Sequence, residues 1–136
     1  MGGMGLPRIL LVEPGPASQA NLCDLLAKAG FEVFASSSDA AANRAQEVGA
    51  DLALMELGAP GTDGFGLMQG MAAEGWPGKV VFLAGGEINQ TKFLLEVARR
   101  LGASATLQRP FEDSELIDCV RRCLNQDVPR AVSAAA

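Results

Sequence analysis

Short apolar runs alternate with segments of helical periodicity along this sequence, and this alternation constrains the fold more than any other feature. The runs at 8–12, 52–55 and 79–83 read RILLV, LALM and KVVFL, and continuous apolar stretches of this length are typical of parallel strands buried on both faces. Two shorter strands are predicted at 32–35 and 105–108. Helices are predicted at 18–29, 38–48, 65–73, 89–101 and 112–125. Repeated strand–helix units predict an α/β fold, a doubly wound five-stranded parallel sheet with helices on both faces.

Local signals set the expected helix boundaries. Ser38 and Asn89 are residue types that favour a helix N-cap, and each stands at the start of a segment with helical periodicity. Gly30, Gly49 and Gly102 follow three of the predicted helices, at the place where glycine most often ends a helix.

Length and composition suit one globular domain, since the chain has 136 residues, of which 49% are apolar and 20% charged. We expect this domain to cover residues 8–126, between an N-terminal extension at 1–7 and a flexible tail at 127–136. No apolar run approaches the roughly 18–20 residues that a membrane span needs, so no membrane association is expected.

Charge and residue types argue against several kinds of site. Histidine is absent, which removes catalytic triads and metal sites built on histidine. The formal net charge of −5 argues against direct binding of nucleic acid, because a binder must neutralise phosphates. Cys23, Cys119 and Cys123 are odd in number and lack CxxC spacing, so we expect reduced thiols and a cytoplasmic protein. Cys119 and Cys123, one helical turn apart, suit either core packing or a redox role.

Charged residues follow three of the predicted strands. Glu13 ends the first strand, Glu56 the third and Arg109 the fifth. In an open α/β sheet the functional crevice lies outside the carboxyl ends of the strands, so these side chains are expected to converge. Paired carboxylates suit Mg²⁺ or a shared proton, whereas the planar guanidinium of Arg109 could bond both carboxylates in a structural ion cluster. The residues alone leave both interpretations open.

Four segments carry a resemblance to a known family: ILLVE, DLALMELGAPGTDGFGL, KVVFLAGG and GASATLQRPF. On these motifs the chain, from Arg8 to about Asn125, resembles the receiver domains of response regulators in bacterial two-component (phosphorelay) signalling. The resemblance implies the flavodoxin-like (βα)5 receiver fold with strand order 2-1-3-4-5. It also implies a signalling module rather than an enzyme, and a cis peptide bond between Arg109 and Pro110.

The residues at the family's phosphorylation site depart from its pattern. The acidic pair that holds Mg²⁺ in receivers corresponds to Glu13 and Pro14, and the phospho-accepting aspartate corresponds to Glu56. The hydroxyl, aromatic and lysine positions of the family correspond to Ala84, Thr106 and Arg109. We therefore expect weak or absent Mg²⁺ binding, no other metal or cofactor, and a receiver that acts without phosphorylation.

Two functions fit such a receiver. One is binding of a protein partner (a histidine kinase, an output domain or a downstream regulator) by a monomer or weak homodimer, through the fourth helix, fifth strand and fifth helix. The other is a response to a small anionic ligand, such as a phosphoryl donor or a cyclic dinucleotide. The candidate basic residues are Lys92, Arg99, Arg100, Arg121 and Arg122. They also suit solvated helix surfaces, with Glu96 and Asp118 as ion-pair partners.

Overall fold

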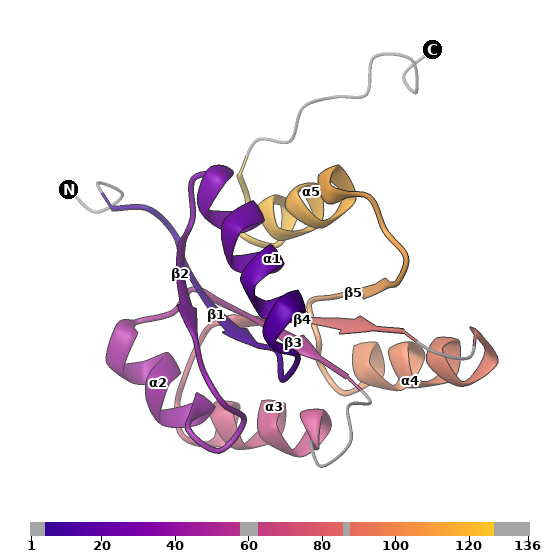
Figure 1. The fold of residues 1–136 in the computed structure, drawn as a ribbon. Helices are drawn as coiled ribbons and strands as arrows, with labels where there is room; N and C mark the ends of the chain where they lie inside the picture. The colour runs from indigo at the N-terminus through magenta and orange to yellow at the C-terminus, as the bar shows by residue number, and fades with distance from the viewer. Residues whose placement is uncertain (1–4, 58–62, 86–87, 127–136) are drawn as a thin grey trace.

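The computed structural model describes residues 5–57, 63–85 and 88–126. Strands and helices alternate along these residues, as the sequence predicts (Figure 1). Their bounds are β1 Arg8–Val12, α1 Pro16–Lys28, β2 Glu32–Ala35, α2 Ala41–Val48, β3 Leu52–Glu56, α3 Gly64–Ala73, β4 Lys79–Ala84, α4 Ile88–Arg100, β5 Ala105–Gln108 and α5 Asp113–Cys123. Within the described residues, no helix has both the length and the apolar character needed to cross a membrane.

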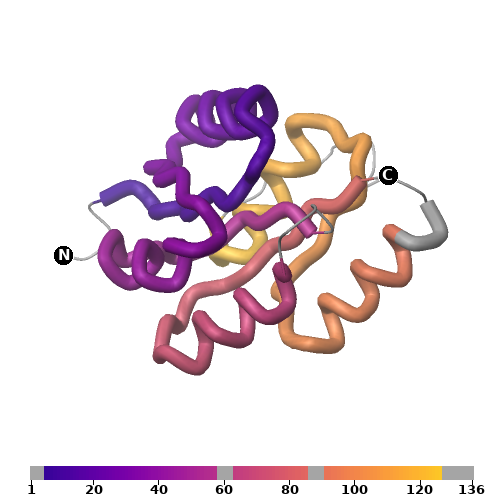
Figure 2. The backbone as a smooth tube through the Cα atoms, turned by 60° about the horizontal axis from the view of Figure 1, so that its bottom comes forward, coloured from indigo at the N-terminus to yellow at the C-terminus, as the bar shows by residue number. Residues whose placement is uncertain are grey.

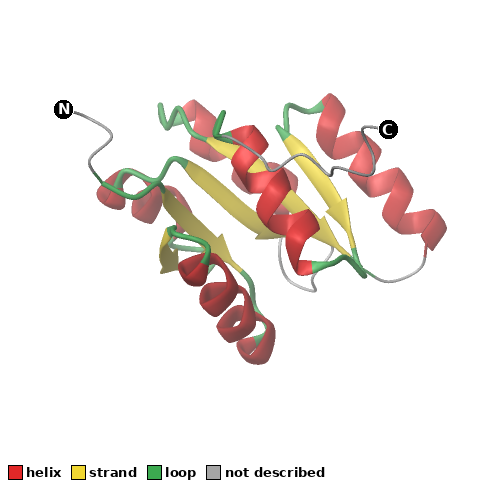
Figure 3. Ribbon diagram, turned by 90° about the horizontal axis from the view of Figure 1, so that it is seen from above, coloured by secondary structure: helices red, strands yellow, loops and turns green. Residues whose placement is uncertain are grey.

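The five strands form one parallel sheet in the order β2-β1-β3-β4-β5, which confirms the predicted topology (Figure 3). At its centre Val12 pairs with Met55, and Glu56 pairs with Leu83. At the β4–β5 end Ala84 pairs with Gln108. Since all the strands run the same way, the residues that follow β1, β3 and β5 meet at one edge of the sheet.

Helices cover both faces of the sheet because alternate strand residues point to opposite sides. Leu10 and Val12 of β1 belong to a core shared with α2, α3 and α4, the face that Figure 2 turns forward. Ile9 and Leu11 belong to a second core that includes residues of α1 and α5. The buried strands thus form the middle layer of three, as continuous apolar runs predict.

The helices α1 and α2 begin two and three residues away from the predicted positions. α1 begins at Pro16 rather than Ser18, because proline fits the first turn of a helix, where its missing N–H is not needed. α2 begins at Ala41 after Ala40, so Ser38 is not its N-cap. The Ser37 Oγ instead accepts a hydrogen bond from the Ala40 N–H at 3.3 Å, and this turn delays the helix.

The start of α4 and the end of α5 were also misplaced. α4 begins at Ile88, so Asn89 lies inside the helix and is not its N-cap. α5 ends at Cys123 rather than Asn125, because Asn125 has a φ of 59°, a left-handed conformation that asparagine tolerates better than most residues. The tail expected at 127–136 and the greater part of the Gly58–Gly64 loop lie outside the described residues.

Candidate functional site

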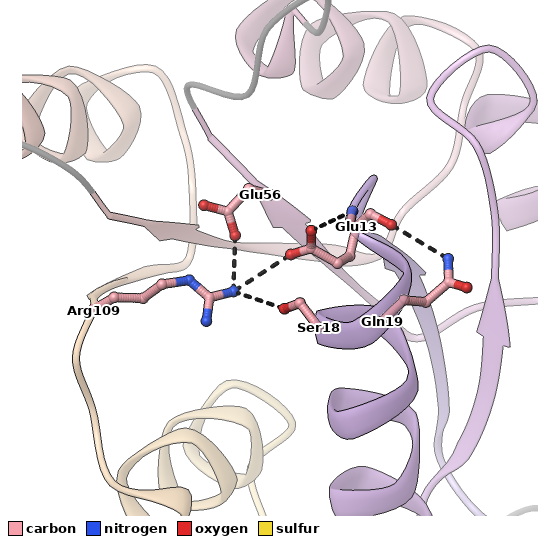
Figure 4. A network of polar contacts seen from close by, with 6 residues as sticks. Glu13, Ser18, Gln19, Glu56 and Arg109 are labelled. Carbon is pink, nitrogen blue, oxygen red and sulfur yellow. Dashed lines mark hydrogen bonds and ion pairs between the residues drawn. The ribbon is translucent and has the colours of Figure 1, made fainter.

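One arginine nitrogen joins two carboxylates at the carboxyl edge of the sheet (Figure 4). The Nη2 atom of Arg109 donates to Glu56 Oε1 at 2.9 Å and to Glu13 Oε1 at 3.4 Å. The same nitrogen lies 3.4 Å from Ser18 Oγ, at the start of α1. The predicted convergence of Glu13, Glu56 and Arg109 is therefore confirmed. The guanidinium bonds both carboxylates, as the structural interpretation of the cluster expects, and it does so through Nη2 alone.

Glu13 is also held from its other side. Its Oε2 atom accepts a hydrogen bond from the Gly15 backbone N–H at 2.8 Å. The Gln19 side-chain amide donates to the Glu13 backbone carbonyl at 3.3 Å, which ties the end of β1 to the first turns of α1. Both carboxylate oxygens of Glu13 therefore have donors within the protein, as a carboxylate with only 8% of its surface exposed requires.

The chain around Arg109 directs its side chain toward the carboxylates. The Arg109 N–H donates to the Ala84 carbonyl at 2.8 Å, which extends the β4–β5 ladder to the sheet edge. A Cβ at Gly85 would lie 3.3 Å from Arg109 Cδ, so glycine leaves room for the arginine stem. The guanidinium carbon lies 5.4 Å from the centre of the Phe111 ring, within the range of a cation–π contact. The peptide bond between Arg109 and Pro110 is cis, as expected.

Electrostatics at this edge are unbalanced, because one guanidinium faces two carboxylates. Burial raises the pKa of Glu56, and its side chain is only 14% exposed. Arg109 lowers the Glu56 pKa through its hydrogen bond and its charge, while the nearby Glu13 raises it again. The net pKa shift is upward, so Arg109 offsets the cost of burying Glu56 only in part.

Mg²⁺ does not fit the residues at this edge. The metal prefers near-octahedral oxygen ligands, commonly one or two carboxylates with several waters. Here the Oε1 atoms of Glu13 and Glu56 both contact the cationic Nη2 of Arg109, and Oε2 of Glu13 accepts from Gly15. The neighbouring Pro14 has no side-chain ligand to add.

A shallow cavity of about 370 Å³ opens over the ion pairs, and a smaller one of about 300 Å³ lies on the β2 side of Glu13. Pro14 and Gly85 line the first cavity together with Arg109 and both carboxylates. Glu13 lines both cavities, whereas Glu56 and Arg109 line only the first of these two.

The chain as a whole matches a family of signalling domains. The family model described as the response regulator receiver domain matches residues 9–121. The chain belongs to the response regulator receiver family. Receivers are signalling modules rather than enzymes, and the ion pairs of Arg109 lie at the sheet edge that the resemblance assigns to the family's phosphorylation site.

Solved receivers share the fold. A response regulator receiver domain from Clostridium thermocellum aligns with a TM-score of 0.78 and 20% identity over 88% of this chain and 95% of that one. The chemotaxis protein CheY4 of Vibrio cholerae gives a TM-score of 0.76 and 20% identity over 88% and 99%. Full-length FixJ from B. japonicum gives 0.74 and 28% identity over 96% and 64%. A search of curated protein sequences gave no match.

Two other positions that the resemblance singles out are apart from the ion pairs. Ala84 is buried at the end of β4 and offers no hydroxyl to the receiver's site. Thr106 lies within β5, paired with Phe82, and is one of the residues that line a separate groove beside α5.

The candidate basic residues of this receiver do not form one cluster. Arg99 is exposed on α4, and Arg100 there pairs with Glu96 at 3.4 Å. On α5, which covers the opposite face of the sheet, the Arg121 Nη2 donates to the Ala29 carbonyl at the end of α1. Lys92 is exposed on α4 and Arg122 on α5. Among the ion pairs of the described residues, Asp118 has no partner, so the expected pair on α5 is absent there.

Ser18, Gln19 and Phe111 are site residues that sequence reasoning missed. Ser18 was missed because the predicted helix started two residues too late. A helix that begins at Pro16 places Ser18 in its first turn, beside the sheet edge. Phe111 was visible in the RPF triplet, but its place against the Arg109 guanidinium depends on the turn after β5.

We predict that Arg109 and Glu56 are energetically coupled. Arg109→Met leaves two buried carboxylates unneutralised, whereas Arg109→Met in a Glu56→Gln background leaves one. The loss of unfolding free energy should therefore be about 1–2 kcal/mol smaller in that background, after allowance for the exposure of one third of the arginine. Urea unfolding, followed by the fluorescence of the buried Trp76, gives the unfolding free energies of the wild type, the two single variants and the double variant. Additive effects would show that the contact carries no energy.

We also predict that Glu56 titrates above the ordinary glutamate range and that Arg109→Met raises its pKa further. Because the folded-state pKa exceeds the unfolded one, the contribution of Glu56 to stability is fully present below the unfolded pKa. It is lost as pH rises through the folded pKa. The unfolding free energy of the wild type relative to Glu56→Gln should thus fall from about pH 4.5 upward. Carboxyl NMR of the Glu56 side chain measures the pKa directly, and a value at or below the ordinary one contradicts the prediction.

Proposed function

We propose that this receiver acts without phosphorylation, as a protein-interaction module of a two-component pathway. The observation that carries the proposal is the pair of contacts from Arg109 Nη2 to Glu56 and Glu13. A cationic side chain of the chain itself lies between the two carboxylates, where the resemblance implies that other receivers hold a metal and a phosphoryl group.

Each position of the family's site supports this proposal. Glu56 extends the acceptor carboxylate by one methylene, about 1.5 Å, and phosphoryl transfer depends on positioning. Pro14 replaces a carboxylate of the acidic pair, and Ala84 replaces the hydroxyl that bonds the phosphoryl group. Thr106 replaces the aromatic residue of the switch. A receiver with these residues lacks the groups through which phosphorylation acts in its relatives.

The ion pairs give the proposed module a fixed conformation. Arg109 connects the ends of β1, β3 and β5, and through Ser18 it also reaches α1. A link of this kind would hold the ends of these three strands and the start of α1 in one arrangement. Its partner would be a histidine kinase, an output domain or a downstream regulator, bound by a monomer or weak homodimer. We place the protein in the cytoplasm, consistent with three cysteines that form no disulfide.

A response to a small anionic ligand is the alternative, but the positions of the basic residues favour it less. A cyclic dinucleotide needs several cations at one place for bidentate contacts and stacking. Arg100 and Arg121 are engaged with Glu96 and with the Ala29 carbonyl, on helices that cover opposite faces of the sheet. Calorimetry with a panel of cyclic dinucleotides distinguishes the two functions, since only the alternative gives heat.

We predict no stable phosphoform when the protein is incubated with acetyl phosphate and Mg²⁺. Intact-mass spectrometry of the reaction reports the addition of a phosphoryl group. A phosphorylatable receiver with an aspartate acceptor serves as the control for the donor. The variant Pro14→Asp/Glu56→Asp/Ala84→Thr/Arg109→Lys restores the family's residues and should gain phosphoryl groups where the wild type does not. A phosphoryl group on the wild type that Glu56→Gln abolishes would contradict the proposal.

A further inference from the structure

A groove beside β5 and α5 holds two of the three cysteines. Its volume is about 660 Å³, within the range of small-molecule sites. Cys119 and Cys123 line it together with Lys79, Ser104 and Arg122. The ion pairs of Arg109 lie elsewhere, since neither Arg109 nor Glu13 nor Glu56 lines this groove. The two sites are therefore separate parts of the surface.

Helical spacing places both thiols on the same side of α5, because residues four apart are neighbours on a helix surface. Cys119 is 8% exposed and Cys123 is 9% exposed, and both belong to the core that α5 shares with α1. They therefore pack against the interior and also line the wall of an open groove. A role in core packing explains their contact with the interior but not their place in the wall of the groove.

Charges around the groove favour the thiolate form of Cys123. The neighbouring Cys119 thiol, together with the cations Lys79 and Arg122, lowers the Cys123 pKa to about 7, although burial opposes this. The pKa of Cys119 is raised, first by its neighbour Cys123 and then by burial, so Cys119 keeps its proton. The helix dipole disfavours an anion at the end of α5, which makes these neighbours necessary.

Acidic residues also line the groove, and they lie toward its other end. Glu115 is two helical turns from Cys123, about 12 Å along the axis, and Asp118 is about 7.5 Å away. The groove is thus cationic beside Cys123 and anionic near the start of α5.

We propose that Cys123 is a site of thiol–disulfide exchange with small disulfides that carry carboxylates, such as glutathione disulfide. The Cys123 thiolate attacks one sulfur of the disulfide, and the bond between the two small-molecule sulfurs breaks as the Cys123 mixed disulfide forms. The leaving thiolate takes the electron pair and then a proton from solvent, so the small disulfide is the oxidant. Lys79 and Arg122, which line the same groove as Cys123, attract the incoming carboxylates.

Such a modification would give this receiver an input that does not pass through Glu56. The added group would occupy the groove and change the surface formed by β5 and α5, while the contacts of Arg109 stay in place. This inference does not depend on whether the receiver is phosphorylated.

Cys23 provides an internal comparison in the same chain. It lies on α1, is more exposed than Cys123, and burial raises its pKa. If exposure alone set the reaction rate, the disulfide would modify Cys23 first. Reactivity governed by thiolate character would modify Cys123 first, since the thiolate is the nucleophile.

The experiment incubates the reduced full-length chain with excess glutathione disulfide at pH 7, quenches with acid and maps each cysteine by peptide mass spectrometry. Against a thiol of the ordinary pKa of 9.0, a pKa of about 7 gives about 50 times more thiolate at pH 7, and lower nucleophilicity removes about tenfold. Because burial raises the Cys23 pKa above the ordinary value, Cys123 should react at least about five times faster than Cys23. Its rate should rise with pH around a midpoint near 7. Modification of Cys23 or Cys119 ahead of Cys123 overturns the proposal.

Variants test the role of the two cations. Lys79→Met and Arg122→Met should each slow Cys123 severalfold at pH 7 and move its pH midpoint upward. Arg100→Met, on α4 at the opposite face of the sheet, is the matched control and should leave the rate unchanged. Circular dichroism and Trp76 fluorescence verify that each variant is folded. Equal rates in the wild type and both cation variants overturn the assignment.

Discussion

The carboxyl edge of this sheet brings the buried Glu13 and the partly buried Glu56 together with a single guanidinium, and the rest of the site follows from that imbalance of charge. Glu13, Glu56 and Arg109 must lie close together, because the parallel strands β1, β3 and β5 all end at the same edge of the sheet. Glu56 would be costly there without a cation, and even with Arg109 its pKa remains raised. If the Arg109 side chain moved away, the two carboxylates would face each other without a cation between them and would repel.

This requirement explains several features of the chain near the site. Gly85 leaves space for the arginine stem, and Phe111 lies against the guanidinium. Gly15 supplies the second donor to Glu13, and a Cβ at this position would lie 3.2 Å from Glu13 Oε2. Small residues and backbone donors thus surround a site that other receivers use for chemistry and that this receiver uses, in our proposal, to hold its strands in place.

The parallel sheet and the meeting of Glu13, Glu56 and Arg109 could be predicted from the residues, because buried apolar runs show which residues end each strand. The strand order followed only from the resemblance to receivers. The choice of donor atom and hydrogen-bond partners at the site could not be predicted from the sequence. The use of Nη2 alone depends on the position of Ser18, which follows from a helix start at Pro16 that periodicity does not mark. Likewise, spacing put Cys119 and Cys123 on one helix face, but the groove depends on how β5 packs beside α5, and Lys79 comes from β4, forty residues before Cys119 in the sequence.

The central claim is that Arg109 stands in place of the metal and phosphoryl group, and a crystal structure determined with Mg²⁺ and beryllofluoride tests it most directly. Beryllofluoride mimics a phosphoryl group on an acceptor carboxylate. The account predicts that Arg109 Nη2 stays within hydrogen-bonding distance of Glu56 and Glu13, with no beryllium on Glu56. Beryllofluoride bound to Glu56, with Mg²⁺ on Glu13 and the Arg109 side chain turned away from both carboxylates, would contradict it.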